Sequence, residues 1–205
     1  MSTPKKRVAI LISGRGSNMS ALIEAAKMPD YAAEIVAVIA NKADAGGLDT
    51  ARAQGIPALA IPHRDHASKS EHERAVSDAL RTAKADIVCL AGYMRIISPE
   101  FVSEWEGRML NIHPSLLPLF KGLHTHEQVL EAGMRVHGCT VHFVTAGTDE
   151  GPIIAQTAVP VKTGDTPDTL AERVLSVEHE TYVRALALVA SGKAVMKDGR
   201  TVFSD

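Results

Sequence analysis

Cysteine and aromatic residues are scarce in this sequence. Its two cysteines, Cys89 and Cys139, stand far apart and form no CxxC pair, which excludes a thiolate zinc site of the usual spacing. Phe, Trp and Tyr make up 4% of the chain, against 45% for hydrophobic residues as a whole, so the core must be mainly aliphatic. A reduced, cytoplasmic protein is the simplest interpretation.

A basic excess and long apolar runs are also missing. The formal net charge of −2 argues against a general nucleic-acid surface, because phosphates are neutralised by Lys and Arg. The apolar run at residues 8–12 is five residues long, and no stretch approaches the ~18–20 apolar residues that span a bilayer. We therefore expect small-molecule partners, no nucleic acid and no membrane, and either a monomer or a homodimer.

Apolar runs and helix-like stretches alternate through the first half of the chain. Helices are predicted at residues 19–27 and 70–84, and a short one is opened by Gly46 and Gly47. This β-α-β-α alternation implies parallel strands with right-handed crossovers and helices on both sheet faces. The ligand cleft of such a sheet lies at the carboxyl ends of the strands. The predicted strands are residues 7–13, 34–40, 57–61 and 87–91.

The pattern changes in the second half. Pro99 marks a helix start, residues 116–128 form a long predicted loop, and a last helix runs from Thr166 to about residue 190, before a tail with at most one edge strand. Overall, the prediction is an α/β fold with a single domain over residues 1–205. It has three layers, a mostly parallel twisted sheet of about seven strands, and helices on both faces. The later strands are predicted at residues 108–112, 138–144 and 152–160.

The segment SGRGSN, residues 13–18, joins a predicted strand to a predicted helix. Its glycines let the backbone approach a ligand, and a helix N-terminus offers unpaired N–H groups to an anion. Met19 occupies the place of a third glycine and the GK[ST] ending is absent, so neither a dinucleotide fingerprint nor a P-loop fits. A single phosphate held by Gly16, Ser17 and Asn18 is one interpretation, and a tight turn without a ligand is the other.

Asn111 and His113 lie two residues apart in a predicted extended segment that ends at Pro114. Residues with this spacing project to the same side of a strand, and a residue before proline is held in extended conformations. A neutral donor beside a titratable ring suits chemistry in which charge develops on a carbonyl oxygen. Asp149, in a loop beyond another strand, brings a carboxylate, which favours the charged form of an imidazole. The competing interpretation is a turn asparagine, a packed histidine and a turn aspartate.

The other histidines carry less weight. His63 with His66, and His124 with His126, have spacings that suit metal ligands, but neither pair has an evident third ligand. Catalytic zinc usually needs three, so we expect no metal. His142 alternates with apolar neighbours and is predicted to be structural or to support the site.

Seven motifs, in order along nearly the whole chain, resemble the phosphoribosylglycinamide formyltransferase family. They are ISGRGSN (residues 12–18), NKADAGGL (41–48), LAGYMRIISPEFV (90–102), NIHPSLLP (111–118), GLHTH (122–126), GCTVHFV (138–144) and DEGPII (149–154). The resemblance implies a Rossmann-like formyltransferase fold. Residues 1–100 would be its phosphate- and substrate-binding half, and residues 101–205 its folate-binding and catalytic half. The implied reaction moves the formyl group of 10-formyltetrahydrofolate, a co-substrate, to the amine of glycinamide ribonucleotide in purine synthesis, without a metal.

The same resemblance assigns three sets of site residues. The catalytic set would be Asn111, His113 and Asp149. The substrate phosphate would bind to Gly16, Ser17 and Asn18, and Glu178 would contact the sugar. The folate would contact Lys69, Met94, Arg95, Ile96, Ile97 and Asn111. Lys69 stands where the family often has arginine, so the charge is kept without the bidentate fork.

Other functions stay open at this point. The chain could formylate a different amine, such as methionyl-tRNA or an amino sugar, or hydrolyse 10-formyltetrahydrofolate. A non-catalytic protein that binds a phosphate ligand on the same fold is the alternative from a different class. A nicotinamide-dependent dehydrogenase is disfavoured by the missing third glycine.

Overall fold

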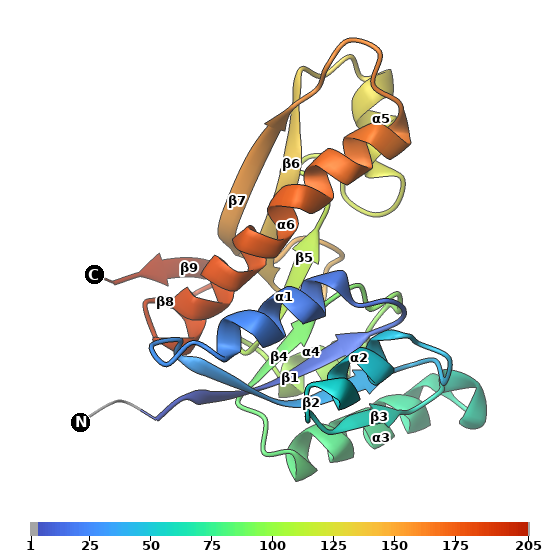
Figure 1. The fold of residues 1–205 in the computed structure, drawn as a ribbon, viewed down its shortest axis with the longest axis vertical. Coiled ribbons are helices and arrows are strands. Elements are labelled where there is room, and N and C mark those ends of the chain that lie inside the picture. Colours follow the sequence, from blue (N-terminus) through green and yellow to red (C-terminus); the bar gives the residue numbers. More distant parts are fainter. Residues whose placement is uncertain (1–3, 205) are drawn as a thin grey trace.

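The computed structural model describes residues 4–204, which form a seven-stranded sheet and a separate two-stranded one (Figure 1). The strand order of the large sheet is β3-β2-β1-β4-β5-β6-β7. Pairs from β3 to β5 are parallel, whereas β6 is antiparallel to both β5 and β7. The predicted mostly parallel sheet is therefore confirmed. Its strands are β1 (Lys6–Ile12), β2 (Ala33–Ala40), β3 (Ala58–Ala60), β4 (Ile87–Leu90), β5 (Met109–His113), β6 (Val136–Phe143) and β7 (Ile153–Pro160).

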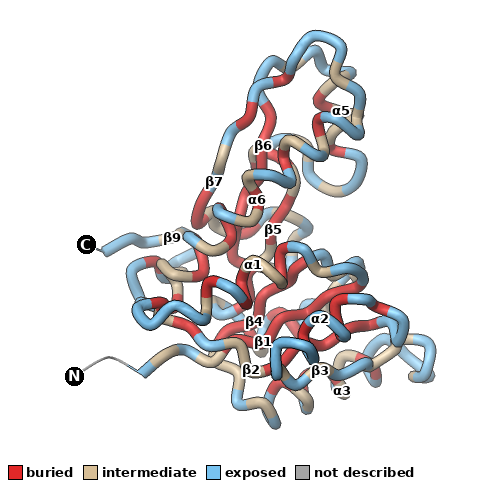
Figure 2. Tube along the Cα trace, in the orientation of Figure 1, coloured by how far each residue is buried: buried red, intermediate tan, exposed pale blue. Residues whose placement is uncertain are grey.

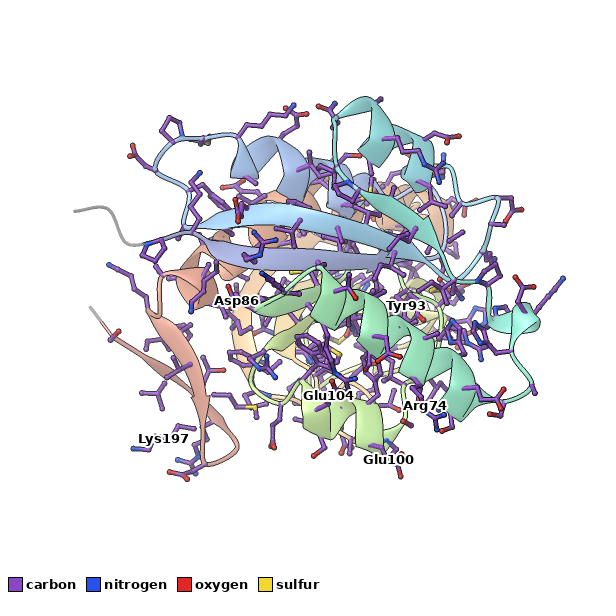
Figure 3. All side chains as sticks on the ribbon, turned by 90° about the horizontal axis from the view of Figure 1, so that it is seen from below. Arg74, Asp86, Tyr93, Glu100, Glu104 and Lys197 are labelled. Carbon is purple, nitrogen blue, oxygen red and sulfur yellow. The ribbon has the colours of Figure 1, made fainter. Side chains whose placement is uncertain are left out.

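Helices cover both faces of the large sheet, as the β-α alternation predicts (Figure 1). One face carries α1 (Ser17–Ala26), α2 (Gly47–Ala53), α5 (Thr125–Glu131) and α6 (Pro167–Ala190). The other carries α3 (Lys69–Thr82), which follows the short 3-10 helix η1 (His63–Asp65), and α4 (Pro99–Glu104). Figure 3 shows this second face, with Glu104 of α4 labelled. Glu104 accepts a hydrogen bond from Ser77 of α3 at 2.9 Å and pairs with Arg81 at 2.7 Å.

Two apolar clusters fill the spaces between the layers. Alternate residues of a strand point to opposite faces, and β1 shows this directly: Ile10 and Ile12 belong to the cluster under α1 and α6, whereas Ala9 and Leu11 belong to the cluster under α3 and α4. All four side chains are fully buried, and Figure 2 shows the central strands as the buried part of the molecule. The sheet is thereby held from both sides.

Two predictions about the second half are wrong. The sequence predicts a loop over residues 116–128, whereas α5 begins at Thr125. The residue before it, His124, has a left-handed φ of 59° and no side-chain capping bond, so the helix lacks its usual start signal. The tail forms a hairpin of β8 (Ala194–Lys197) and β9 (Arg200–Phe203) instead of one edge strand. Asp198 and Gly199 turn it with φ of 50° and 70°, the conformation for which Asp-Gly is favoured.

The carboxyl ends of β1 and β4 are tied together at one edge of the sheet. The Ser13 hydroxyl, just after β1, accepts from the N–H of Met94 at 2.8 Å. Farther inside, the Tyr182 hydroxyl of α6 lies 3.1 Å from the carbonyls of both Leu90 and Leu110. The first contact joins the loops after β1 and β4, and the second holds β4 and β5 together below them. A ligand cleft is expected at this edge. None of the helices within residues 4–204 has the length and apolar character needed to cross a bilayer.

Candidate active site

The loop after β1 turns at Gly16, which has a φ of 71°. This left-handed conformation favours glycine, and a Cβ at this position would also lie a tight 3.1 Å from the end of the Met19 side chain. Among the described residues α1 has no side-chain cap, and the first N–H groups of a helix have no partner within it. This geometry, beginning at Ser17, favours an anion.

Asn18 and Glu178 bring α1 and α6 together beside this loop. Nδ2 of Asn18 donates to Oε2 of Glu178 at 2.8 Å, and both side chains are buried. Burial raises the pKa of Glu178, and the bond from Asn18 opposes that rise. The Oδ1 atom of Asn18 is buried and has no hydrogen-bond partner within residues 4–204. Such an atom is normally satisfied by water or a ligand, so this pair is suited to receive a polar group.

Asn111 lies on β5 directly opposite His142 of β6. Nδ1 of His142 is 2.8 Å from the Phe143 carbonyl and must donate to it, which leaves Nε2 as an acceptor when the ring is neutral. Nδ2 of Asn111 lies 3.3 Å from that Nε2 atom. Burial is the main cause that lowers the pKa of His142, which favours the neutral ring. His142 therefore fixes which way the Asn111 carboxamide points.

His113 is buried at the end of β5, and each of its ring nitrogens faces an acceptor. Nε2 lies 2.9 Å from the Phe120 carbonyl, and Nδ1 lies 3.4 Å from Oδ2 of Asp149. Carbonyl and carboxylate oxygens accept but do not donate, so the arrangement suits an imidazolium with a hydrogen on each nitrogen. Asp149 has a φ of 53° and also accepts from the Gly122 N–H at 2.9 Å. Its other oxygen is 3.8 Å from His142.

The loop after β4 presents apolar side chains to solvent. Met94 is 71% exposed and Ile96 is 81% exposed. Arg95 and Ile97 of the same loop line a small recess together with Lys69, the first residue of α3. The Lys69 ammonium is 3.9 Å from a carboxylate oxygen of Glu73 on the next turn. The surface thus combines exposed apolar groups with two cationic side chains, which suits a flat apolar ring that carries an acidic tail.

His126 and His137 form a pair between α5 and β6. Nδ1 of His126 and Nε2 of His137 are 3.1 Å apart, with the rings edge to face. One nitrogen must accept, so at least one ring of the pair is neutral. Burial lowers the pKa of both rings, that of His137 to about 4. Within residues 4–204 no group of three or more His, Cys, Asp or Glu side chains is arranged to hold a metal ion.

Acid is expected to destabilise the fold through His137. A histidine of the unfolded chain titrates near pH 6.5, so above that pH both states are neutral and His137 contributes nothing. Below it the unfolded chain binds more protons, and the stability falls until the pH approaches the folded value of about 4. At pH 5 the expected loss of unfolding free energy is about 2 kcal/mol.

Urea unfolding at pH 7 and pH 5 tests this expectation. The loss of unfolding free energy between the two pH values should be smaller for His137→Asn than for the unmodified chain. His124→Asn, at a ring with a 75% exposed side chain, should behave like the unmodified chain, and equal losses in all three proteins would contradict the assignment.

Most residues singled out from the sequence lie at this carboxyl edge. Asp149 lies against both His113 and His142, and His142 contacts Asn111, so His142 links Asn111 to the other two. Asn18 meets Glu178. The site also contains groups that the sequence does not reveal. The Phe120 carbonyl is one, because no side-chain type marks it. His142 is predicted from the sequence to be structural or to support the site, but its contact with Asn111 is not, because that contact depends on the β5-β6 register.

The fold and the polar cluster at its carboxyl edge are those of an α/β group-transfer enzyme. Comparison with known proteins agrees: residues 6–186 match the Formyl transferase family. Phosphoribosylglycinamide formyltransferase from Escherichia coli is 44% identical over 93% of this chain and 90% of its own length. A solved structure of the phosphoribosylglycinamide formyltransferase from Brucella melitensis is 58% identical, with a TM-score of 0.88 over 92% of this chain and 97% of that one. The chain belongs to the phosphoribosylglycinamide formyltransferase family.

Two further relatives show how this unit is used elsewhere. The trifunctional purine biosynthetic protein adenosine-3 of Bos taurus is 56% identical over 92% of this chain. The chain spans only 19% of that protein, so the match concerns one unit of a longer polypeptide. Formyltetrahydrofolate deformylase from Burkholderia mallei is 31% identical, with a TM-score of 0.88 over 98% of this chain and 70% of that one. The same fold therefore occurs in a protein named for deformylation.

Proposed function

We propose that this chain transfers the formyl group of 10-formyltetrahydrofolate to the amine of 5-phosphoribosylglycinamide, giving formylglycinamide ribonucleotide and tetrahydrofolate in purine biosynthesis. The observation that carries the proposal is the series of contacts that runs from Asn111 through His142 and Asp149 to His113. It places the amide donor of Asn111 near the His113 ring, whose two nitrogens face acceptors. Both residues lie at the same edge of the sheet as the anion-favouring loop at Gly16. The names of the full-length relatives support the same reaction.

Asn111 and His113 act on the charge that develops during transfer. As the amine attacks the formyl carbon, the formyl oxygen becomes negative, and an N–H of Asn111 donates to it. Imidazolium at His113, held by Asp149, adds a positive charge nearby and is the proton source for the leaving nitrogen. The amine loses one proton and the leaving nitrogen gains one, so the transfer is balanced. Because both His113 nitrogens already face acceptors, donation requires that the Phe120 contact open or that a water carry the proton.

The ribonucleotide is anchored away from the reacting carbon. Its phosphate binds the N–H groups at Gly16, Ser17 and Asn18, where a glycine turn meets the start of a helix. Its sugar hydroxyls meet Glu178 and the Oδ1 atom of Asn18, which has no hydrogen-bond partner within residues 4–204. Holding two reactants in one geometry removes much of the entropic barrier to their reaction. The loop residues therefore contribute to rate as well as to affinity.

The folate binds against the loop after β4. Met94, Ile96 and Ile97 provide the apolar surface for its ring, and Arg95 and Lys69 provide charge for its acidic tail. Asn111 reaches the formyl end. The exposed apolar side chains beside two cations fit such an amphipathic molecule, and no metal takes part in this proposal.

A two-substrate assay tests the proposal. Loss of 10-formyltetrahydrofolate is followed with and without 5-phosphoribosylglycinamide, while formate is measured in parallel. Formyl transfer predicts folate consumption only with the ribonucleotide, at one equivalent, without formate. Formate release in the absence of the amine would identify a hydrolase like the related deformylase. Binding of both ligands without consumption of either would leave a non-catalytic binding protein.

Asn18→Ala is expected to raise the KM for the ribonucleotide about tenfold, since one hydrogen bond to a ligand is worth about 1–1.5 kcal/mol. The buried Asn18 side chain lies beside Glu178 at the start of α1, not on the loop after β4. The KM for the folate should therefore stay within about twofold. Initial rates with each substrate varied in turn give both constants. Equal increases in the two constants would count against a ribonucleotide site at this loop.

A further inference from the structure

Two polar residues stand beside His113 in one row across the sheet. His113 of β5 lies opposite Thr140 of β6, and Thr140 lies opposite Gln156 of β7. The Thr140 side chain is fully buried. A buried hydroxyl needs hydrogen-bond partners. Only one partner of the Thr140 hydroxyl, Gln156, is on a neighbouring strand. The others lie in the loop that follows His113.

Thr140 and Gln156 hold this loop through a closed set of hydrogen bonds. The Thr140 hydroxyl donates to the Ser115 carbonyl at 2.7 Å. It accepts from the Leu117 N–H at 3.0 Å and from Nε2 of Gln156 at 2.9 Å. The same Nε2 atom also donates to the Leu117 carbonyl at 2.9 Å. A hydroxyl has one donor and two acceptor positions, and an amide nitrogen has two hydrogens, so the capacity of both groups is used in full.

Residues 115–122, which are held in this way, contain the backbone groups that contact His113 and Asp149. The Ser115 hydroxyl donates to the Leu119 carbonyl at 2.7 Å, which folds the chain back. Phe120 follows with a φ of 52°, a left-handed conformation that is unusual for a bulky residue and persists only when the surroundings impose it. In this conformation its carbonyl lies 2.9 Å from Nε2 of His113. Two residues later the Gly122 N–H reaches Asp149.

We propose that Thr140 and Gln156 are positioning residues for formyl transfer: they hold residues 115–122 so that the Phe120 carbonyl and the Gly122 amide fix His113 and Asp149. This inference rests on the proposed function, because it assigns His113 to the reaction. Neither Thr140 nor Gln156 touches the reacting atoms. Their effect is on the orientation of the ring, and small errors in the placement of a catalytic group reduce rates strongly.

The test replaces the Thr140 hydroxyl and then restores it. Thr140→Val keeps the shape but cannot make the three hydrogen bonds, and Thr140→Ser keeps the hydroxyl. Thr157→Val is the matched control, because Thr157 lies next to Gln156 on β7 but pairs with Thr181 of α6 at 2.6 Å instead of with the loop after His113. We expect Thr140→Val to lower kcat about 10- to 100-fold, with the KM for the ribonucleotide within about twofold. Thr140→Ser should recover most of the rate, and Thr157→Val should resemble the unmodified chain.

A spectroscopic signature completes the test independently of turnover. In protein with ¹⁵N-labelled histidine, the Nε2–H proton of His113 should be protected from exchange in the unmodified chain and in Thr140→Ser, and exposed in Thr140→Val. Gln156→Met, at an exposed position, gives the same readouts if Thr140→Val does not fold. Unchanged kcat and unchanged protection in a folded variant would overturn the inference while leaving formyl transfer intact. If the unmodified chain transfers no formyl group, the proposed function fails, and the protection data still decide whether Thr140 and Gln156 hold His113.

Discussion

Replacing His113 with alanine is expected to lower kcat for formyl transfer by about 10²- to 10⁴-fold, the usual contribution of a positioned general acid or base. The ring is buried between the Phe120 carbonyl and the Asp149 carboxylate, so no other side chain replaces its charge. The anion-favouring loop at Gly16 lies after a different strand, β1. The KM for the ribonucleotide should therefore change little, and steady-state kinetics with both substrates separate the two constants.

His124→Ala is the matched control for this experiment. His124 follows in the same connection, with a 75% exposed side chain that pairs with Glu127. Its loss should leave kcat within about twofold. If His113→Ala retains more than about a tenth of the activity, His113 is not the proton source. If the KM rises while kcat is unchanged, His113 acts through binding that is equal in the ground state and the transition state.

The first half of the fold is readable from the sequence because each signal is local. Apolar runs of strand length, separated by helix-like stretches, predict parallel strands, and the sheet contains them in the order β3-β2-β1-β4. The turn at Gly16 is local too, since a glycine between a strand and a helix suffices to indicate it. The spacing of Asn111 and His113 works for the same reason, because side-chain alternation along β5 places them on one side.

The remaining site contacts join segments that are far apart in the sequence, and local sequence patterns do not predict which of these segments meet. Asn18 meets Glu178, 160 residues away, because α6 packs beside α1. The Asn111–His142 pair depends on the register of two antiparallel strands. The missed hairpin is a different case, because Asp198 and Gly199 between two alternating segments form a recognisable turn signal. The hairpin of β8 and β9 could therefore have been predicted from the sequence.

Replacing Asn111 with alanine is expected to lower kcat by about 10²- to 10³-fold, or about 2.7–4 kcal/mol of barrier, as for other single oxyanion donors. Asn111→Asp should lose at least as much. A carboxylate has the same shape but cannot donate when ionised, and its charge opposes the negative charge on the formyl oxygen. Kinetics for both variants, at matched substrate saturation, check the order. A fully active Asn111→Asp would mean that Asn111 does not act as a donor.

The geometry further predicts how Asn111 depends on His142. Neutral His142 offers Nε2 to one N–H of Asn111, which directs the other N–H toward the ligand. His142→Ala should therefore lower kcat through misorientation, by less than Asn111→Ala does. The double variant should be no slower than Asn111→Ala alone, because a residue that acts through Asn111 has nothing left to orient once Asn111 is gone. Additive losses would instead assign His142 a separate action on the reaction, for which its 3.8 Å approach to Asp149 is the available contact.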